Sequence, residues 1–359
     1  MEFKEYELGT IIECHDKKRK PLSTIQRAKI KGQYPYYGAQ EIIDYINDYI
    51  FDGRYILLAE DGENLRSGIK PLLKIVNNKF WLNNHAHIFT CKEGYNLEYL
   101  YYALLKYDFQ PYITGTTQPK LNQENMMKIK IKLPELEIQN KISKILCRID
   151  KKIDLNNQMN NNLLHIGMEL LKDNFNKTNN FEVLSNVINF IKGKRPSNIT
   201  ADKQEGYEKY LTIACLNEQE LNYADTTKMI MSNNDLLMVM DGASSGDVYY
   251  AGYGIVGSTL ARIDCLNNKY ISEFIYFVMK YYKELIQSKN TGSAIPHTDK
   301  IFVSGLKIPK LSLENQERYR VLLSKIQQNN VENANLIKLR DTLIPKLMNG
   351  EIDLDEIEV

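Results

Sequence analysis

Two long segments of the chain repeat apolar residues every three or four positions, the spacing of one face of an α-helix. In the first segment the apolar positions are Ile138, Ile142, Ile145, Ile149, Ile153, Met159, Leu163, Ile166, Leu170 and Phe175. In the second they are Val321, Leu322, Ile326, Leu336, Leu339, Leu343 and Leu347. The pattern predicts one helix from Glu135 to Phe175, about 60 Å long at ~1.5 Å per residue. It predicts another between Pro309 and Gly350.

Asparagines interrupt both apolar patterns near their middle. They are Asn156, Asn157, Asn160, Asn161 and Asn162 in the first segment and Asn329, Asn330, Asn333 and Asn335 in the second. Polar residues in a helix-helix seam cost stability, yet they can fix the register and the choice of partner. We therefore expect the two helices to pair with each other, antiparallel about a pseudo-twofold axis.

Each helical segment follows a region that mixes short strands with one tyrosine-rich helix. The strand patterns YILLAEDG (55–62) and LLMVMDG (236–242) each end in an Asp-Gly turn, and the tyrosine-rich helices are expected at 96–107 and 272–285. The predicted fold class is α/β (α+β), with two globular domains separated by two long helices. The expected boundaries are 1–134, 135–178, 179–309 and 310–359.

The second half of the sequence repeats the first at an offset of about 175 to 180 residues, a periodicity that marks an internal duplication. YELGTIIECHDKKRKP aligns with FEVLSNVINFIKGKRP, which places Leu8 against Leu184 and Pro21 against Pro196. Near the ends of the halves, Gly115 aligns with Gly292, Pro119 with Pro296, Pro134 with Pro309 and Gln139 with Gln316. Three blocks in the same order make a chance alignment improbable.

Composition narrows the function classes. The chain has 359 residues, 43% of them hydrophobic and 25% charged, as expected for two folded domains. The net charge of +1 gives no overall attraction to nucleic acid or membrane, so any site for a polyanion must be local. No apolar run approaches the ~20 residues of a membrane span. The start, MEFKEYELG, lacks the features of a secretory signal, and the five scattered cysteines form no close pairs, so a cytoplasmic protein with reduced thiols is expected.

The strongest nucleic-acid signal is a basic segment without acidic residues, KKRKPLSTIQRAKIK (17–31). It carries Lys17, Lys18, Arg19, Lys20, Arg27, Lys29 and Lys31, and the second half carries Lys192, Lys194 and Arg195 at the corresponding place. Such clusters can neutralise phosphates and release counterions. The alternative is a solvated loop. The repeated placement favours a function.

Two glycine-containing loops, 115–120 and 292–297, precede the return to each long helix. Their candidate donors to phosphates or bases are Thr116, Thr117, Gln118, Lys120, Ser293 and His297. The alternative is a turn that only closes each domain. Tyr34, Tyr36 and Tyr37 are equally compatible with sugar-phosphate contacts and with packing.

Several apparent catalytic or metal motifs are excluded by their context. GYGIVG (252–257) has dinucleotide-type glycine spacing, but the STLARID that follows is typical of a strand, not a helix. His85 and His87 lack nearby ligands for a metal, and Asp61 and Asp241 are explained by turns. The sequence also contains no P-loop, no Asn-Pro-Pro-aromatic or Asp-Pro-Pro-aromatic tetrad, and no Pro-Asp pair. We expect a protein that is not an enzyme and binds no metal.

Layout and residues together resemble the DNA-specificity subunit (HsdS) of type I restriction-modification systems, over the entire chain. The most specific stretches are YPYYGAQEIIDYINDYIFDGRYILLAEDGENL (34–65), GTTQPKLNQ (115–123), LPELEIQNKISKILCRIDKKIDLNNQMNNNL (133–163) and LRDTLIPKLMNGEI (339–352). The resemblance implies two target-recognition domains, each reading one half of a bipartite double-stranded DNA sequence. It also implies a helical spacer on which two methyltransferase subunits dock.

The same resemblance implies that catalysis resides in the partners. The methyltransferase subunits would use S-adenosylmethionine to methylate adenine at N6, a motor-nuclease subunit would add restriction where present, and this chain would bind no cofactor. Two alternatives remain open at this point: a self-contained DNA modification enzyme, and a coiled-coil adaptor that binds only proteins. The first requires methyl transfer by the chain alone, and the second requires that it bind no DNA.

Overall fold

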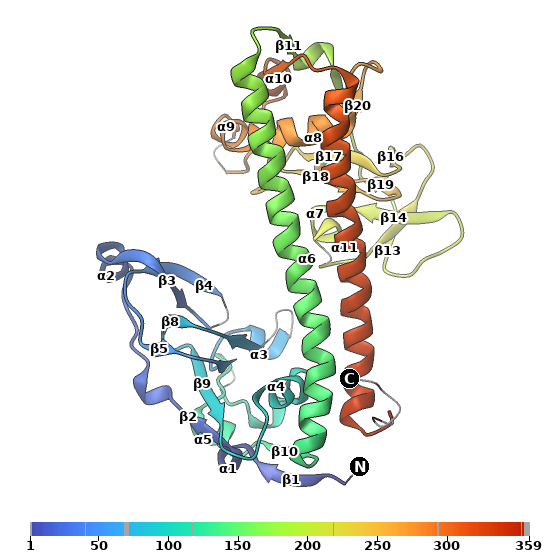
Figure 1. Cartoon of the computed structure of the whole chain (residues 1–359). Coiled ribbons are helices and arrows are strands. Elements are labelled where there is room, and N and C mark those ends of the chain that lie inside the picture. Colours follow the sequence, from blue (N-terminus) through green and yellow to red (C-terminus); the bar gives the residue numbers. More distant parts are fainter. Residues whose placement is uncertain are drawn as a thin grey trace. The chain divides into compact units, whose positions relative to one another are not determined.

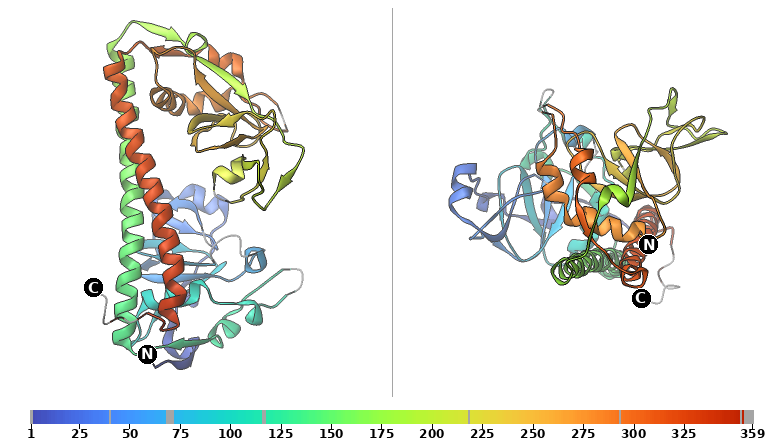
Figure 2. Two further views of the ribbon diagram at one scale, coloured as in Figure 1. Left: turned by 90° about the vertical axis from the view of Figure 1, so that its right-hand side faces the viewer. Right: turned by 90° about the horizontal axis from the view of Figure 1, so that it is seen from above.

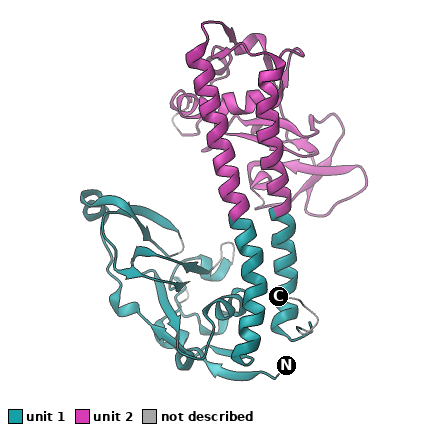
Figure 3. Ribbon diagram, viewed as in Figure 1, with its two compact units in different colours: residues 1–154, 333–359 teal, residues 155–332 magenta. Residues whose placement is uncertain are grey.

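The computed structural model describes residues 2–39, 41–67, 72–115, 118–217, 219–292, 294–352 and 354. The chain divides into two compact units (Figure 3). Unit 1 comprises residues 1–154 and 333–359, and unit 2 comprises residues 155–332. Each unit therefore contains one mixed α/β region together with one segment of each long helix. The four-part division expected from the sequence stays a prediction.

The two long helices are α6 (Leu136–Lys177) and α11 (Leu313–Met348), shown green and orange-red in Figure 1. In unit 1, Arg340 of α11 donates to Asp150 of α6 over 2.8 Å. In unit 2, Asn174 of α6 donates to the Tyr319 hydroxyl of α11 over 2.9 Å. The partner's number falls as the α6 number rises, so the helices pack antiparallel, as predicted and as Figure 2 shows from the side.

The asparagines lie partly in the helix-helix seam. Asn160 donates to Asn330 and accepts from Asn329, both over 2.8 Å, and Asn156 donates to Glu332 over 2.9 Å. Asn156, Asn160 and Asn329 are buried, so a shift of one helix by a turn would break these side-chain hydrogen bonds and leave buried polar groups unpaired. The predicted role in register is consistent with this pairing, while Asn161, Asn162 and Asn335 face solvent.

The mixed region of unit 1 contains two four-stranded sheets, ordered β2-β9-β6-β7 and β4-β3-β8-β5, and the pair β1-β10. Its strands are β1 (Lys4–Glu7), β2 (Ile12–Cys14), β3 (Lys31–Tyr37), β4 (Ile42–Ile46), β5 (Phe51–Asp52), β6 (Tyr55–Ala59), β7 (Leu73–Val76), β8 (Lys79–Leu82), β9 (Ala86–Cys91) and β10 (Lys130–Leu133). Its helices are α1 (Leu8–Ile11), α2 (Thr24–Lys29), α3 (Asn64–Ser67), α4 (Leu97–Leu105) and α5 (Gln123–Met127), with 3-10 turns at Asp16–Lys18 and Gln110–Tyr112.

The mixed region of unit 2 has a four-stranded sheet β12-β20-β17-β18, a five-stranded sheet β13-β15-β14-β19-β16 and the pair β11-β21. Its strands are β11 (Phe181–Val183), β12 (Ile188–Lys192), β13 (Ile199–Thr200), β14 (Tyr207–Leu211), β15 (Tyr223–Asp225), β16 (Met231–Ser232), β17 (Asp235–Val239), β18 (Val248–Ala251), β19 (Gly254–Val256), β20 (Leu260–Cys265) and β21 (Lys307–Pro309). Its helices are α7 (Ile213–Leu216), α8 (Ser272–Tyr281), α9 (Lys283–Ser288) and α10 (Lys300–Ser304), with a 3-10 turn at Leu184–Asn186.

The sheets of the two units correspond strand by strand. The order β2-β9-β6-β7 matches β12-β20-β17-β18, and β4-β3-β8-β5 matches β15-β14-β19-β16, with β13 added at one edge. Each second sheet also contains one parallel pair, β3 with β8 and β14 with β19. The internal repeat predicted from the sequence is therefore confirmed. GYGIVG forms β19 and leads into β20, so no helix follows it, as expected.

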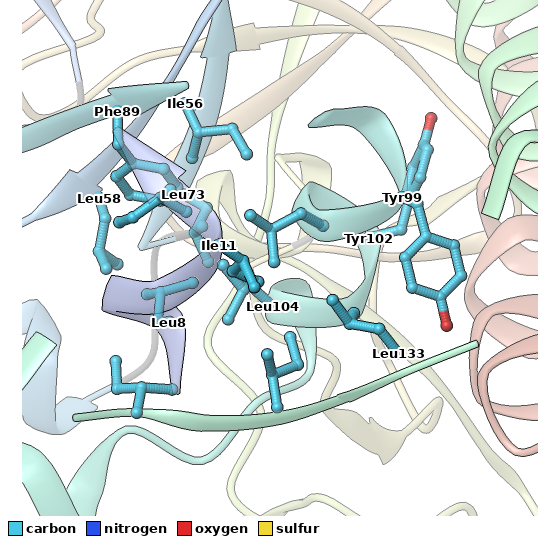
Figure 4. Close-up of a cluster of buried hydrophobic side chains, with 14 of the residues drawn as sticks. Leu8, Ile11, Ile56, Leu58, Leu73, Phe89, Tyr99, Tyr102, Leu104 and Leu133 are labelled. Atoms are coloured by element: carbon cyan, nitrogen blue, oxygen red, sulfur yellow. The ribbon is translucent and has the colours of Figure 1, made fainter. Parts of the chain in front are cut away.

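Burial of the central strands and the tyrosine-rich helices explains the folding of each unit. The core of unit 1 joins Leu8 and Ile11 to β6, β9 and α4 (Figure 4). Each large apolar side chain buried there contributes roughly 1.5–3 kcal/mol. The repeat extends to single contacts, since the amides of Leu8 and Leu184 donate to the carbonyls of Ile129 and Leu306.

One buried glutamine fixes the start of each long helix. The Gln139 side chain accepts from the Asn96 amide and donates to Pro134, and the Gln316 side chain accepts from the Ile271 amide and donates to Leu311. Both thereby connect the start of a tyrosine-rich helix to a long helix. None of the described helices is long and apolar enough to cross a membrane.

Candidate nucleic-acid interface

The two glycine loops are closed by the same backbone contacts. Thr114 and Lys120 exchange hydrogen bonds of 2.8 Å each, and Thr291 and His297 exchange bonds of 2.9 and 2.7 Å. Gly115 has φ +87° and Gly292 has φ +89°, a left-handed conformation that glycine adopts without strain. A Cβ atom at either glycine would lie 2.3 Å from a carbonyl oxygen of its own loop. This geometry requires glycine at both positions, which explains the repeat of this residue.

Each loop is attached to the end of a central buried strand. Leu121 donates to the Glu60 carbonyl after β6, and Thr298 donates to the Met240 carbonyl after β17, both over 2.8 Å. The side chain of Gln118 is exposed. Three predicted contact residues, Thr116, Thr117 and Ser293, lie outside the described residues.

The first basic segment divides into exposed and internally bonded side chains. Lys17, Lys18, Lys20 and Lys29 are exposed, and none has a side-chain partner among the described residues. Arg27 instead binds Asp44 over 3.1 Å, and Lys31 binds the same carboxylate. The four lysines thus remain available for phosphates, whereas Arg27 and Lys31 hold α2 and β3 against β4.

Arg19 belongs to a buried ionic cluster that sequence reasoning missed. Its guanidinium bonds to Glu60 over 2.6 Å and to Asp16 over 3.2 Å. His87 lies between Asp16, 2.6 Å from Nδ1, and the Leu121 carbonyl, 2.7 Å from Nε2. Lys120 completes the cluster, 3.2 Å from Glu60. The basic segment, the end of β6, strand β9 and the first glycine loop therefore meet at this cluster.

The cations of the cluster outweigh the effect of burial on its carboxyls. Burial raises the pKa of Asp16, but the hydrogen bond and charge of His87, the Ile88 amide and Arg19 lower it below the ordinary value. The pKa of Glu60 is lowered too, since Arg19, His87 and Lys120 together overcome its desolvation. Both carboxyls are therefore ionised at neutral pH.

Asp16, Glu60 and His87 also form a group of three potential metal ligands whose ligand atoms lie within 4.8 Å of one another. Asp16 bonds to His87 and Arg19, and Glu60 bonds to Arg19 and Lys120, so cations of the protein already neutralise both carboxylates. The donor set thus fits an ion-pair network better than a cation site. The His85 side chain bonds instead to Asp61, over 2.9 Å. The cluster could not be recognised in the sequence, because Asp16 and His87 are far apart along the chain and meet only when β2 pairs with β9.

Unit 2 contains a smaller and more exposed counterpart. Asp241, which follows β17, accepts from Lys192 over 3.0 Å and from His297 over 2.7 Å. These bonds lower the pKa of Asp241 although burial raises it. Lys194 and Arg195 are exposed, and neither has a side-chain partner in the described part of the chain. The predicted turn residue Asp241 thus also connects the second basic segment to the second glycine loop.

The tyrosines of β3 have packing roles. Tyr36 and Tyr37 are buried, and the Tyr36 hydroxyl accepts from the Leu22 amide over 2.8 Å. Tyr34 is half-buried, with its ring centroid 5.1 Å from that of Tyr49. For Tyr36 and Tyr37 the structure favours packing over DNA contact.

Comparison with known proteins identifies relatives of this chain. A protein of Haemophilus influenzae named for a type I restriction enzyme specificity subunit is 37% identical over 128 residues, which are 36% of this chain and 32% of that protein. The match thus spans about a third of that relative. The specificity subunit of the type I restriction enzyme MjaIX from Methanocaldococcus jannaschii is 25% identical, with 99% of this chain and 98% of that protein covered.

The fold has a solved counterpart. The S subunit of a type I restriction-modification system from M. genitalium superposes with a TM-score of 0.59 at 17% identity, covering 96% of each chain. The sequence profile of the type I restriction modification DNA specificity domain matches twice, at residues 1–165 and 176–340. The two matches span nearly the whole chain and coincide with its internal repeat. This chain therefore belongs to the type I restriction modification DNA specificity family.

Proposed function

We propose that this chain is the DNA-recognition subunit of a type I restriction-modification complex and that it reads a bipartite double-stranded target. Each unit reads one part of the target through its exposed basic side chains and its glycine loop. The observation that carries this proposal is the duplication of the loop: the same closing contacts and the same left-handed glycine occur beside a basic segment in both units. A turn that only closed a domain would not require cations beside it twice.

The partners in this proposal are two methyltransferase subunits, which bind S-adenosylmethionine and methylate adenine at N6, and a motor-nuclease subunit where one exists. The chain itself holds no cofactor and works in the cytoplasm. Support for docking comes from unit 2, where apolar side chains of both long helices are exposed away from their shared seam. These residues are Leu155, Met159 and Ile166 on α6 and Val321 and Val331 on α11.

The decisive experiment supplies the chain with its methyltransferase subunits and a random DNA library. Mapping N6-methyladenine in the product should reveal two short specified sequences separated by an unspecified gap. Replacing residues 1–134 with the equivalent domain of a relative should change one of the two sequences and leave the other unchanged. A change in both would show that the units do not read separately.

The same proteins and DNA also test the two rival functions. Methyl transfer from labelled S-adenosylmethionine by the chain alone would establish a self-contained modification enzyme. Failure of the chain to retard DNA in a gel, with and without methyltransferase subunits, would establish a protein adaptor. The proposal requires transfer only with the partner present and DNA binding by the assembled complex.

A further inference from the structure

In each unit, one carboxylate joins a cation from the amino-terminal strand region to a cation from the glycine loop. The first ion triad consists of Arg19, Glu60 and Lys120, and the second of Lys192, Asp241 and His297. In both triads the carboxylate lies just after an inner strand of the first sheet: Glu60 is the first residue after β6, and Asp241 is the second residue after β17. Three segments that are far apart in the sequence are thus held together by one acidic group.

The two triads are built from partly different positions. Lys120 and His297 correspond, since each forms the closing ladder of its loop. Glu60 and Asp241 do not, because Asp241 corresponds to Asp61, as the matching bridges of Asp61 with Lys120 and of Asp241 with His297 show. The charge arrangement therefore recurs although the carboxylate has moved by one residue. That recurrence indicates a role for the arrangement and not merely a shared ancestral side chain.

An acid beside a phosphate-binding surface has two opposing effects. It repels DNA of any sequence, because its charge has the same sign as the phosphates. It also holds two mutually repelling cations in one geometry, which lowers the conformational entropy lost when both engage a specific site. A residue with no role in DNA binding would show neither effect. Removal of the acid should separate the two effects.

We propose that Glu60 and Asp241 are positioning residues for DNA recognition, each holding the basic segment and the glycine loop of its unit in the arrangement that discriminates one half of the target. Neither carboxylate contacts the base edges; each acts through the two cations of its triad. This inference rests on the proposed function above and extends it to residues that DNA itself would repel.

The test compares Glu60→Gln and Asp241→Asn with the unaltered chain, each assembled with its methyltransferase subunits. Binding is measured at several salt concentrations on three duplexes: the target found by methylation mapping, the target with its first half scrambled, and the target with its second half scrambled. Glu63→Gln and Asp202→Asn are matched controls, since each removes an exposed acid of the same unit that has no ion-pair partner among the described residues. Glu60→Asp retains the charge.

We expect Glu60→Gln to weaken binding of the intact target about tenfold while strengthening binding of scrambled duplexes about two- to threefold. Its salt dependence should steepen, because more cations are free to displace counterions. Asp241→Asn should do the same, and the half of the target that loses discrimination should differ between the two variants. Glu60→Asp should restore most of the discrimination of the first half.

Other results overturn the proposal. Parallel losses on intact and scrambled duplexes would show a merely structural role, and binding equal to that of the control variants would show no role. If Glu60→Gln fails to fold, Asp241→Asn, whose triad is more exposed, decides the question. Absence of discrimination by the unaltered complex would instead contradict the proposed function, so the two failures are distinguishable.

Discussion

The two ion triads differ in their access to solvent. In unit 1 the side chains of Arg19 and Glu60 are 13% and 12% exposed, and Arg19 continues into the buried Asp16–His87 pair. In unit 2, Lys192 and His297 are about half exposed beside Asp241 at 24%. A buried charge left without its partner is strongly destabilising, whereas an exposed pair contributes little to stability. Arg19 and Glu60 are therefore largely buried in unit 1, where only Lys120 is about half exposed, whereas both cations of the triad in unit 2 lie at the surface.

The largest expected effect is on the stability of unit 1. Arg19→Ala removes the one cation that bonds to both Asp16 and Glu60, so that only His87 and Lys120 remain beside two largely buried carboxylates, and it should lower the free energy of unfolding of unit 1 by about 3–5 kcal/mol. The single tryptophan, Trp81, lies in β8 and donates to the Lys20 carbonyl over 2.6 Å, so its fluorescence in a urea titration follows this unit.

The controls for that prediction come from both units. Lys17→Ala, which removes an exposed and unpaired cation of the same segment, should change the free energy by less than about 0.5 kcal/mol. Lys192→Ala in unit 2 should cost about 1 kcal/mol or less, because solvent screens its pair. A small effect of Arg19→Ala would remove the distinction between a buried and a surface triad.

Acid should destabilise unit 1 more steeply than unit 2. The folded-state pKa values of Asp16 and Glu60 lie below the ordinary 3.8 and 4.5, so their stabilising contribution is complete above those values and is lost as the pH falls further. The urea concentration at the unfolding midpoint, followed by Trp81 fluorescence, should therefore decrease as the pH is lowered below about 4.5. Asp16→Asn should make this decrease shallower. An equally steep fall in Asp16→Asn would assign the acid sensitivity to other groups.

These differences also show where sequence reasoning succeeds. The long helices and the glycine loops were predictable, because helical periodicity and the alignment of Gly115 with Gly292 are visible in the sequence without knowledge of which strands pair. Asp16, Glu60 and His87 were not recognised as a cluster, because their proximity depends on strand pairing between distant segments. Arg19 and Arg27 were grouped with exposed lysines for the same reason: composition records a charge and not the acid that folding places beside it.

Neutralising only the exposed lysines should sharpen the contrast between free and paired cations. Replacing Lys17, Lys18 and Lys20 with Gln should weaken binding of intact and scrambled duplexes to a similar extent, about tenfold, because phosphate contacts carry little sequence information. The slope of log affinity against log salt should flatten by up to about 3 units. An unchanged slope in a filter-binding titration would show that this segment is only a solvated loop.

The smallest expected effect compares the two loop cations by substitution. Lys120 and His297 occupy the same loop position, and each bonds to the carboxylate of its triad, Lys120 to Glu60 over 3.2 Å and His297 to Asp241 over 2.7 Å. His297→Gln removes the imidazole and leaves Asp241 bonded to Lys192. This change should reduce discrimination of the second half-target about two- to threefold and leave the first unchanged, because solvent screens so exposed a pair. His297→Lys should retain most of the discrimination, and equal loss of both halves in a competition assay would show that the loop cation does not act within its own unit.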